Sequence, residues 1–193
     1  MGEFEMKKKM LIFIMTALLL VTGMCSAASA KGASGERVAI LLMGSNDFKT
    51  DQYFAMIGKY FLDNNPHHNR ILVGSDIQSR YQEYWLDKGF LEEQKPGKED
   101  LTALVDYLDV DKVLFLMVKD PVVEKSFAMD FFESGERSRA SIQVNAFLAD
   151  RERVLKLKAA NHEDDSFASD LRAKRGAFKK CVVEISKDML PLM

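Results

Sequence analysis

Polar residues that follow three predicted strands are the best candidates for chemistry in this chain. They are Ser45, Asn46, Ser75, Asp76 and Lys119. Each follows a short apolar run, and the carboxyl ends of parallel strands meet at one edge of a sheet, where ligands of α/β proteins bind. Free N–H groups at helix starts, together with serine hydroxyls and a lysine, could hold an anion or a small molecule at this edge.

The same residues also have a purely structural interpretation. A Gly-Ser-Asp segment after a strand is an ordinary way to turn the chain and begin a helix. The sequence contains no Walker or dinucleotide fingerprint and no G-x-S-x-G elbow. The structural interpretation is therefore favoured, and no catalytic residue and no cofactor is predicted.

A basic face on the last predicted helix is the second candidate site. Arg172, Arg175 and Lys179 are three and four residues apart, so they share one side of that helix. Such a face would bind an acidic partner or a phosphate-bearing envelope polymer, although a solvated helix surface is the simpler alternative. Arg137 and Arg139 could extend the patch.

Histidine and cysteine give no sign of a metal or nucleophilic site. His67 and His68 lie in a predicted loop without a neighbouring ligand in the sequence. His162 belongs to an acidic segment, 161–165, that is expected to lead into the last helix, and the ligand spacing of an EF-hand is absent. Cys181 falls on the apolar stripe of that helix, which predicts a buried and unreactive thiol.

Hydrophobic periodicity predicts how these residues are positioned. The expected order is β-α-β-α-α-β-β-β-α, which is an α/β (α+β) fold with a mixed sheet of about five strands and helices packed on it. Segment 119–136 is expected to be an irregular, mobile loop. The predicted strands are 38–43, 71–73, 113–118, 141–148 and 154–159, and the predicted helices are 50–63, one that ends near 88, 99–108 and 166–189.

The first 30 residues have the order of a secretory signal peptide. Three lysines precede an apolar run, 10–21, and small residues end in Ala28-Ser29-Ala30, which is typical of a cleavage site. A membrane anchor needs about 20 apolar residues, and a lipidated Cys25 would follow a poor lipobox. We therefore expect cleavage after Ala30 and export to the periplasm or the exterior, with translation starting at Met1 or Met6.

The chain that remains after cleavage has an ordinary composition. Without residues 1–30, which hold three lysines and two glutamates, it has 163 residues, 24 of them basic and 27 acidic. This balance gives no general attraction to nucleic acid or anionic lipid, and no stable membrane span remains. Cys181 is its one cysteine, so no internal disulfide can form. The length suits a single exported α/β domain, 31–193.

Several local patterns resemble a group of small exported α/β domains. They are the apolar strand 38–43, the segment Leu108–Val118 with Val110-Asp111 before a strand, the Leu148-Ala149-Asp150 turn, and the string Arg172–Cys181. The element order and these patterns resemble the TolB N-terminal, CsgG and LpoB kind, and a group of uncharacterised exported bacterial proteins.

The resemblance implies a non-catalytic envelope protein that binds another protein of the cell envelope. The chain departs from that group because it has no clear lipobox, no propeller and no membrane-barrel segment. The alternative is a binder of a small molecule or an anion, or an enzyme, that uses the edge formed by the ends of the parallel strands.

Overall fold

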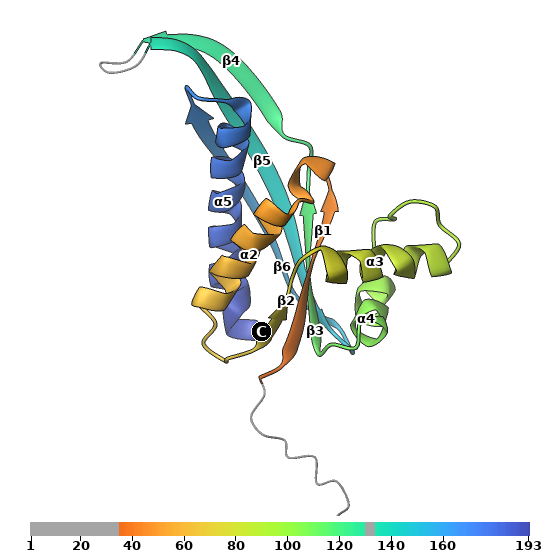
Figure 1. Cartoon of the computed structure of the whole chain (residues 1–193). Helices are drawn as coiled ribbons and strands as arrows, with labels where there is room; N and C mark the ends of the chain where they lie inside the picture. Colours follow the sequence, from red (N-terminus) through yellow and green to blue (C-terminus); the bar gives the residue numbers. More distant parts are fainter. Residues whose placement is uncertain (1–34, 130–133) are drawn as a thin grey trace, which may run out of the picture. The chain divides into compact units, whose positions relative to one another are not determined.

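The computed structural model describes residues 35–129 and 134–193, and the expected signal peptide lies outside them (Figure 1). Among the described residues, no helix is long and apolar enough to cross a membrane.

The predicted α/β class is confirmed. The elements are β1 (Arg37–Gly44), the 3-10 helix η1 (Asn46–Phe48), α2 (Asp51–Asp63), β2 (Arg70–Leu72), α3 (Ser75–Asp87), α4 (Lys98–Tyr107), β3 (Lys112–Val118), β4 (Val122–Met129), β5 (Ser134–Asp150), β6 (Val154–Ser166), α5 (Asp170–Met189) and η2 (Leu190–Leu192).

The strands form one mixed sheet with the order β2-β1-β3-β5-β4, in which β6 also pairs with β5. Strand β1 pairs in parallel with β2 and β3. Strand β5 is antiparallel to β3, β4 and β6. The predicted mixture of parallel early strands and an antiparallel late hairpin is therefore confirmed.

The expected loop 119–136 is wrong, because most of it is β-structure. Strand β4 pairs with the first half of β5, from Val122 opposite Ser141 to Met129 opposite Ser134. Most of β4 is exposed on both faces, so it lacks the apolar alternation by which a half-buried strand is recognised. Residues 130–133 lie outside the described part of the chain.

The late hairpin is also longer than expected. Strand β6 continues to Ser166, so the acidic segment 161–165 lies in a strand and does not lead directly into the last helix. Helix α5 begins at Asp170, and the Ser169 hydroxyl accepts a hydrogen bond from the backbone N–H of Arg172 at 3.2 Å. Polar residues on the wet face of β6 hid the strand, because charge clusters are more common in loops.

Helices cover both faces of the sheet because its central strands are apolar on both sides. Alternate residues of a strand point to opposite faces. Ile40 and Leu42 join the core under α2 and α5, whereas Ala39 and Leu41 join the core under α3 and α4. The fold is therefore three layers deep, with the pair α2 and α5 on one face.

A glutamine completes the hydrogen bonds of strand β1 where its neighbour β2 is too short. Strand β2 pairs only with Arg37–Ala39, so the backbone of Leu42 has no strand partner on that side. The buried Gln78 side chain of α3 accepts from the Leu42 N–H at 3.0 Å and donates to the Leu42 carbonyl oxygen at 2.7 Å. Its amide group thus replaces a missing strand.

We expect Gln78→Ala to lower the free energy of unfolding by about 1–3 kcal/mol, because the buried polar groups of Leu42 lose their partners. Urea unfolding monitored by circular dichroism measures the change. Gln82→Ala, at an exposed site on the same helix, is the matched control and should change stability by less than about 0.5 kcal/mol. Equal effects of the two substitutions would contradict this role for Gln78.

Candidate functional site

Three aromatic rings hold α2 and α5 together on one face of the sheet. The rings of Phe48 and Phe178 stack with centroids 5.0 Å apart, and Tyr53 meets both rings edge-on, at 5.0 Å and 5.2 Å. All three side chains are buried. Aromatic contacts of this kind contribute beyond the area that they bury, so the cluster sets where the two helices lie relative to each other.

A groove of about 1100 Å³ lies on the solvent side of α2 and α5. Arg172, Arg175 and Lys179, the basic face predicted from the sequence, all line it. The remaining lining residues include Gln52, Ala55, Met56, Lys59 and Tyr60 from α2, Gly176, Lys180, Val183, Glu184 and Lys187 from α5, and His162 and Asp164 from β6. We call this feature the α2–α5 groove.

Most cations of the groove lack an acidic partner. Among the described residues, no salt bridge involves Arg172, Arg175 or Lys179, and none involves Lys59 or Lys187. Other lysines of α5 are paired: Lys174 contacts Asp47 at 2.6 Å, and Lys180 contacts Asp164 at 2.6 Å. The groove therefore carries a local excess of positive charge, although the chain as a whole is slightly acidic.

Lys59, Tyr60 and Lys187 were missed as candidates in the sequence. Lys59 and Tyr60 lie on α2, more than a hundred residues from α5 in the chain, so no spacing rule connects them with the basic face. The Lys179 ammonium lies 6.0 Å from the centre of the Tyr60 ring, which is at the limit of a cation–π contact. Only the packing of α2 beside α5 brings Lys59 and Tyr60 to the basic face, whereas Lys187 lies on α5 itself, eight residues after Lys179.

A glycine makes room for the acidic side chain in the groove. A Cβ atom at position 176 would overlap the carboxylate of Asp164, so any larger residue would displace that carboxylate. Asp164 accepts from the Lys180 ammonium at 2.6 Å. The chain thus already places one carboxylate against the cations of α5.

A denser network of charges lies between β6 and α5, and its members His162 and Glu184 also line the groove. The Lys158 ammonium contacts Glu184 at 2.7 Å and Asp188 at 2.8 Å. The Nε2 atom of His162 lies 2.7 Å from the same Glu184 carboxylate. The hydrogen bond from Lys158 is the largest cause of a lowered pKa at Glu184, and the contact with His162 adds to it. Lys158 also lowers the pKa of Asp188.

The predicted strand-end residues are divided between depressions, because Ser75 and Asp76 line one pocket and Asn46 lines another. Strand β2 ends level with Ala39, whereas β1 and β3 continue together to Gly44 and Val118. Five further residues of β1 extend about 16 Å. The chain covers part of this length on its way through Val73 and Gly74 to Ser75, and Gln78, one turn into α3, reaches Leu42 of β1.

The backbone groups near Ser45 and Lys119 are already used. The N–H of Ser45 donates to the Val118 carbonyl oxygen at 3.3 Å, and the N–H of Lys119 donates to that of Gln143 at 3.0 Å. Asn46 faces a different depression, which it shares with Lys49 and Glu93. The free N–H groups that an anion would need are not found at these two positions.

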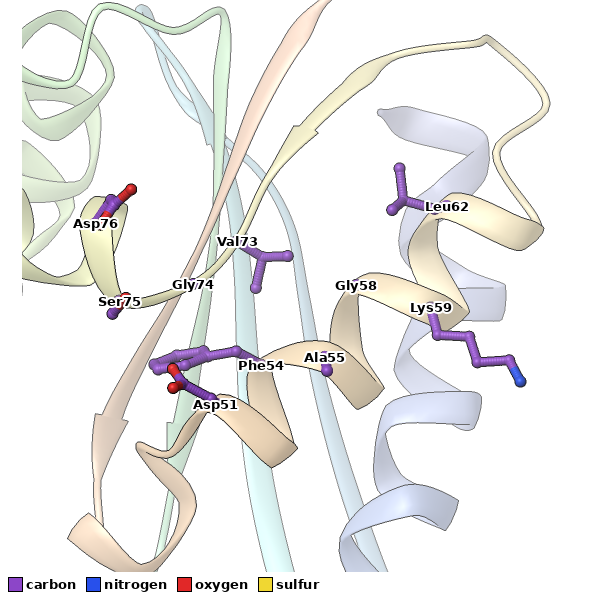
Figure 2. Close-up of a pocket in the computed structure, with 10 residues that line it drawn as sticks. All are labelled: Asp51, Phe54, Ala55, Gly58, Lys59, Leu62, Val73, Gly74, Ser75 and Asp76. Atoms are coloured by element: carbon purple, nitrogen blue, oxygen red, sulfur yellow. The ribbon is translucent and has the colours of Figure 1, made fainter.

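Ser75 and Asp76 line a separate pocket of about 450 Å³ between α2 and the start of α3 (Figure 2). Asp51 of α2 also lines it, so two carboxylates belong to the pocket. Figure 2 shows the Lys59 side chain directed away from Ser75 and Asp76. This arrangement suits an anion poorly, because two negative charges oppose it.

Cys181 is buried, as predicted from the apolar stripe. Burial raises the pKa of its thiol to about 11, so the thiolate form that a nucleophile requires is scarce at neutral pH. His67 and His68 are exposed in the segment between α2 and β2. Across residues 35–129 and 134–193, no group of three His, Cys, Asp or Glu side chains is close enough to hold a metal ion.

We expect Glu184→Gln to flatten the acid side of the curve of stability against pH. The folded chain holds the pKa of Glu184 below its usual value of 4.5, so the carboxylate adds stability above that value and loses it as the pH falls through the lowered pKa. The difference in unfolding free energy between wild type and variant should therefore shrink on acidification. Urea unfolding across the acid range tests this, with the exposed Glu83→Gln as control, and a constant difference at every pH would contradict it.

Comparisons with known proteins give a likeness in fold only. No protein-family model matches the chain, and no curated protein matches it. Similar solved structures include the hypothetical protein CT253 from Chlamydia trachomatis, with 11% identity, 81% of this chain and 96% of that one covered, and a TM-score of 0.44. A second similar structure is the lipoprotein GNA1162 from Neisseria meningitidis, with 13% sequence identity and a TM-score of 0.40. The alignment covers 79% of this chain and 99% of that protein. A third is the LpoB C-terminal domain from Salmonella enterica, with 8% sequence identity and a TM-score of 0.36. The alignment covers 69% of this chain and 87% of that domain. Bacterial lipoproteins are thus among the similar structures, at identities and TM-scores too low to transfer a partner or an activity.

Proposed function

We propose that this protein is a non-catalytic, exported protein of the cell envelope that binds a protein partner through the α2–α5 groove. One observation carries the proposal. Arg172, Arg175 and Lys179 line a large groove and have no acidic partner among the described residues. Three cations held close together repel one another, and a partner with acidic groups would relieve that repulsion.

The proposed location depends on the sequence of the first 30 residues. The lysines at 7–9, the apolar run and the small residues before Ala30 have the order of a cleaved secretory signal. After cleavage, residues 31–193 would act in the periplasm or outside the cell. A protein partner of the envelope is then the partner class to which the groove would have access.

The alternative of a small-molecule or anion site at the strand ends has less support. Asn46 lines a different depression from Ser75 and Asp76, and the pocket that contains Ser75 and Asp76 also contains Asp51. The groove, by contrast, is both large and of one predominant charge.

The experiment that tests this function is crosslinking in the native envelope. The full gene would be expressed in its host with a photo-crosslinking residue at position 52, on the α2 wall of the groove, and the captured proteins would be identified by mass spectrometry. We expect one specific partner, and we expect the triple variant Arg172→Glu, Arg175→Glu, Lys179→Glu to lose it, because like charges would then face the partner.

The control for charge is a second triple variant, Lys95→Glu, Lys98→Glu, Arg153→Glu, at exposed sites outside the groove. It changes the net charge by the same amount, so it should keep the partner. Capture that is equal in both variants, or no capture above background in wild type, would count against the proposed function.

A further inference from the structure

We infer that the α2–α5 groove takes an acidic amphipathic helix of the partner protein. This inference rests on the proposed function and names the kind of segment that the groove recognises. Two features of the groove support it together: cations along its walls and apolar surface between them. A third feature, the position of Asp164, shows how a carboxylate fits there.

The cations follow the length of α5 at intervals of about one helical turn. Arg172, Arg175 and Lys179 are three and four residues apart, and Lys187 continues the line two turns later. Residues at these spacings lie about 5–6 Å apart on a helix surface. Carboxylates placed three and four residues apart on a partner helix have the same spacing, so several ion pairs can form at once.

The surface between the cations is partly apolar. Met56 and Tyr60 of α2 and Val183 of α5 are half-buried, and Ala55 is exposed. An amphipathic helix that lies in a groove buries its apolar face there. A polymer of phosphates has no apolar face and would leave these side chains in contact with water, so the observations favour a peptide.

The chain's own Asp164 occupies part of the groove. Its carboxylate fills the space above Gly176 and accepts from the Lys180 ammonium at 2.6 Å. A carboxylate therefore fits against α5 at this point without steric conflict. Arg172, Arg175 and Lys179, which no carboxylate of the described residues reaches, remain for the partner.

The groove also has a length that suits a helix. From Arg172 to Lys187 the lining residues of α5 extend over sixteen residues, which corresponds to about 22 Å of helix. A partner helix of about four turns would run along it. Helices that pack side by side commonly lie 8–10 Å apart, a separation that lets long Arg and Lys side chains reach acidic groups at the edges of the contact.

The test uses a synthetic peptide as the probe. A fluorescein-labelled peptide of about 18 residues would carry leucine at positions i, i+3, i+4 and i+7 and glutamate beside that stripe. Its binding to the exported protein, purified after expression of the full gene, is measured by fluorescence anisotropy. We expect the triple variant Arg172→Glu, Arg175→Glu, Lys179→Glu to bind at least about tenfold more weakly, because several ion pairs become repulsive. The control triple variant at Lys95, Lys98 and Arg153 should bind like wild type.

Two further probes separate shape from charge. A scrambled peptide of the same composition keeps the glutamates but scatters the leucines, and sodium polyphosphate supplies negative charge alone. We expect the amphipathic peptide to bind about tenfold more tightly than the scrambled one. Ala55→Gln, which places an amide in the apolar surface at an exposed site, should reduce that difference while leaving the weak binding of the scrambled peptide unchanged.

Equal binding of the two peptides, or binding of polyphosphate in preference to both, would overturn the inference. The proposed function is judged separately, by capture from the native envelope. If a partner is captured through the groove but the crosslink maps to a segment without acidic residues, the proposed function stands and the acidic helix is wrong. If no partner is captured, both fail.

Discussion

Strands β1 and β3 bury side chains on both faces, and the rest of the fold follows from that constraint. A sheet whose central strands are apolar on both sides must be covered twice, because each exposed face would leave apolar area in water. The cover on one face comes from α3 and α4, and on the other from α2 and α5. The chain connections are consistent with this cover. Strands β1, β2 and β3 are parallel, and a crossover between parallel strands usually contains a helix.

The α2–α5 groove is a consequence of that second layer of helices. Helices α2 and α5 come from opposite ends of the chain but share one sheet face, and the cluster of Phe48, Tyr53 and Phe178 joins their inner sides. The three rings of this contact are not among the residues that line the α2–α5 groove. A change in the aromatic cluster would therefore alter the groove without touching any residue that lines it.

Charge is distributed unevenly around α5. Between β6 and α5, the Lys158 ammonium is paired with the carboxylates of both Glu184 and Asp188. On the groove side, Arg172, Arg175 and Lys179 are left unneutralised at neighbouring positions, which costs some stability through mutual repulsion.

The sequence by itself determined the class of fold and the basic face, because both are local patterns. The apolar runs 38–43 and 113–118 indicated buried strands, and the spacing of Arg172, Arg175 and Lys179 placed them on one side of a helix. Strand β4 was not predictable, since its identity comes from pairing with β5 and not from its own alternation. Only the tertiary structure decided where the parallel strands end relative to one another and that α2 packs beside α5. Both depend on contacts between segments far apart in the chain, which no periodicity within one segment records.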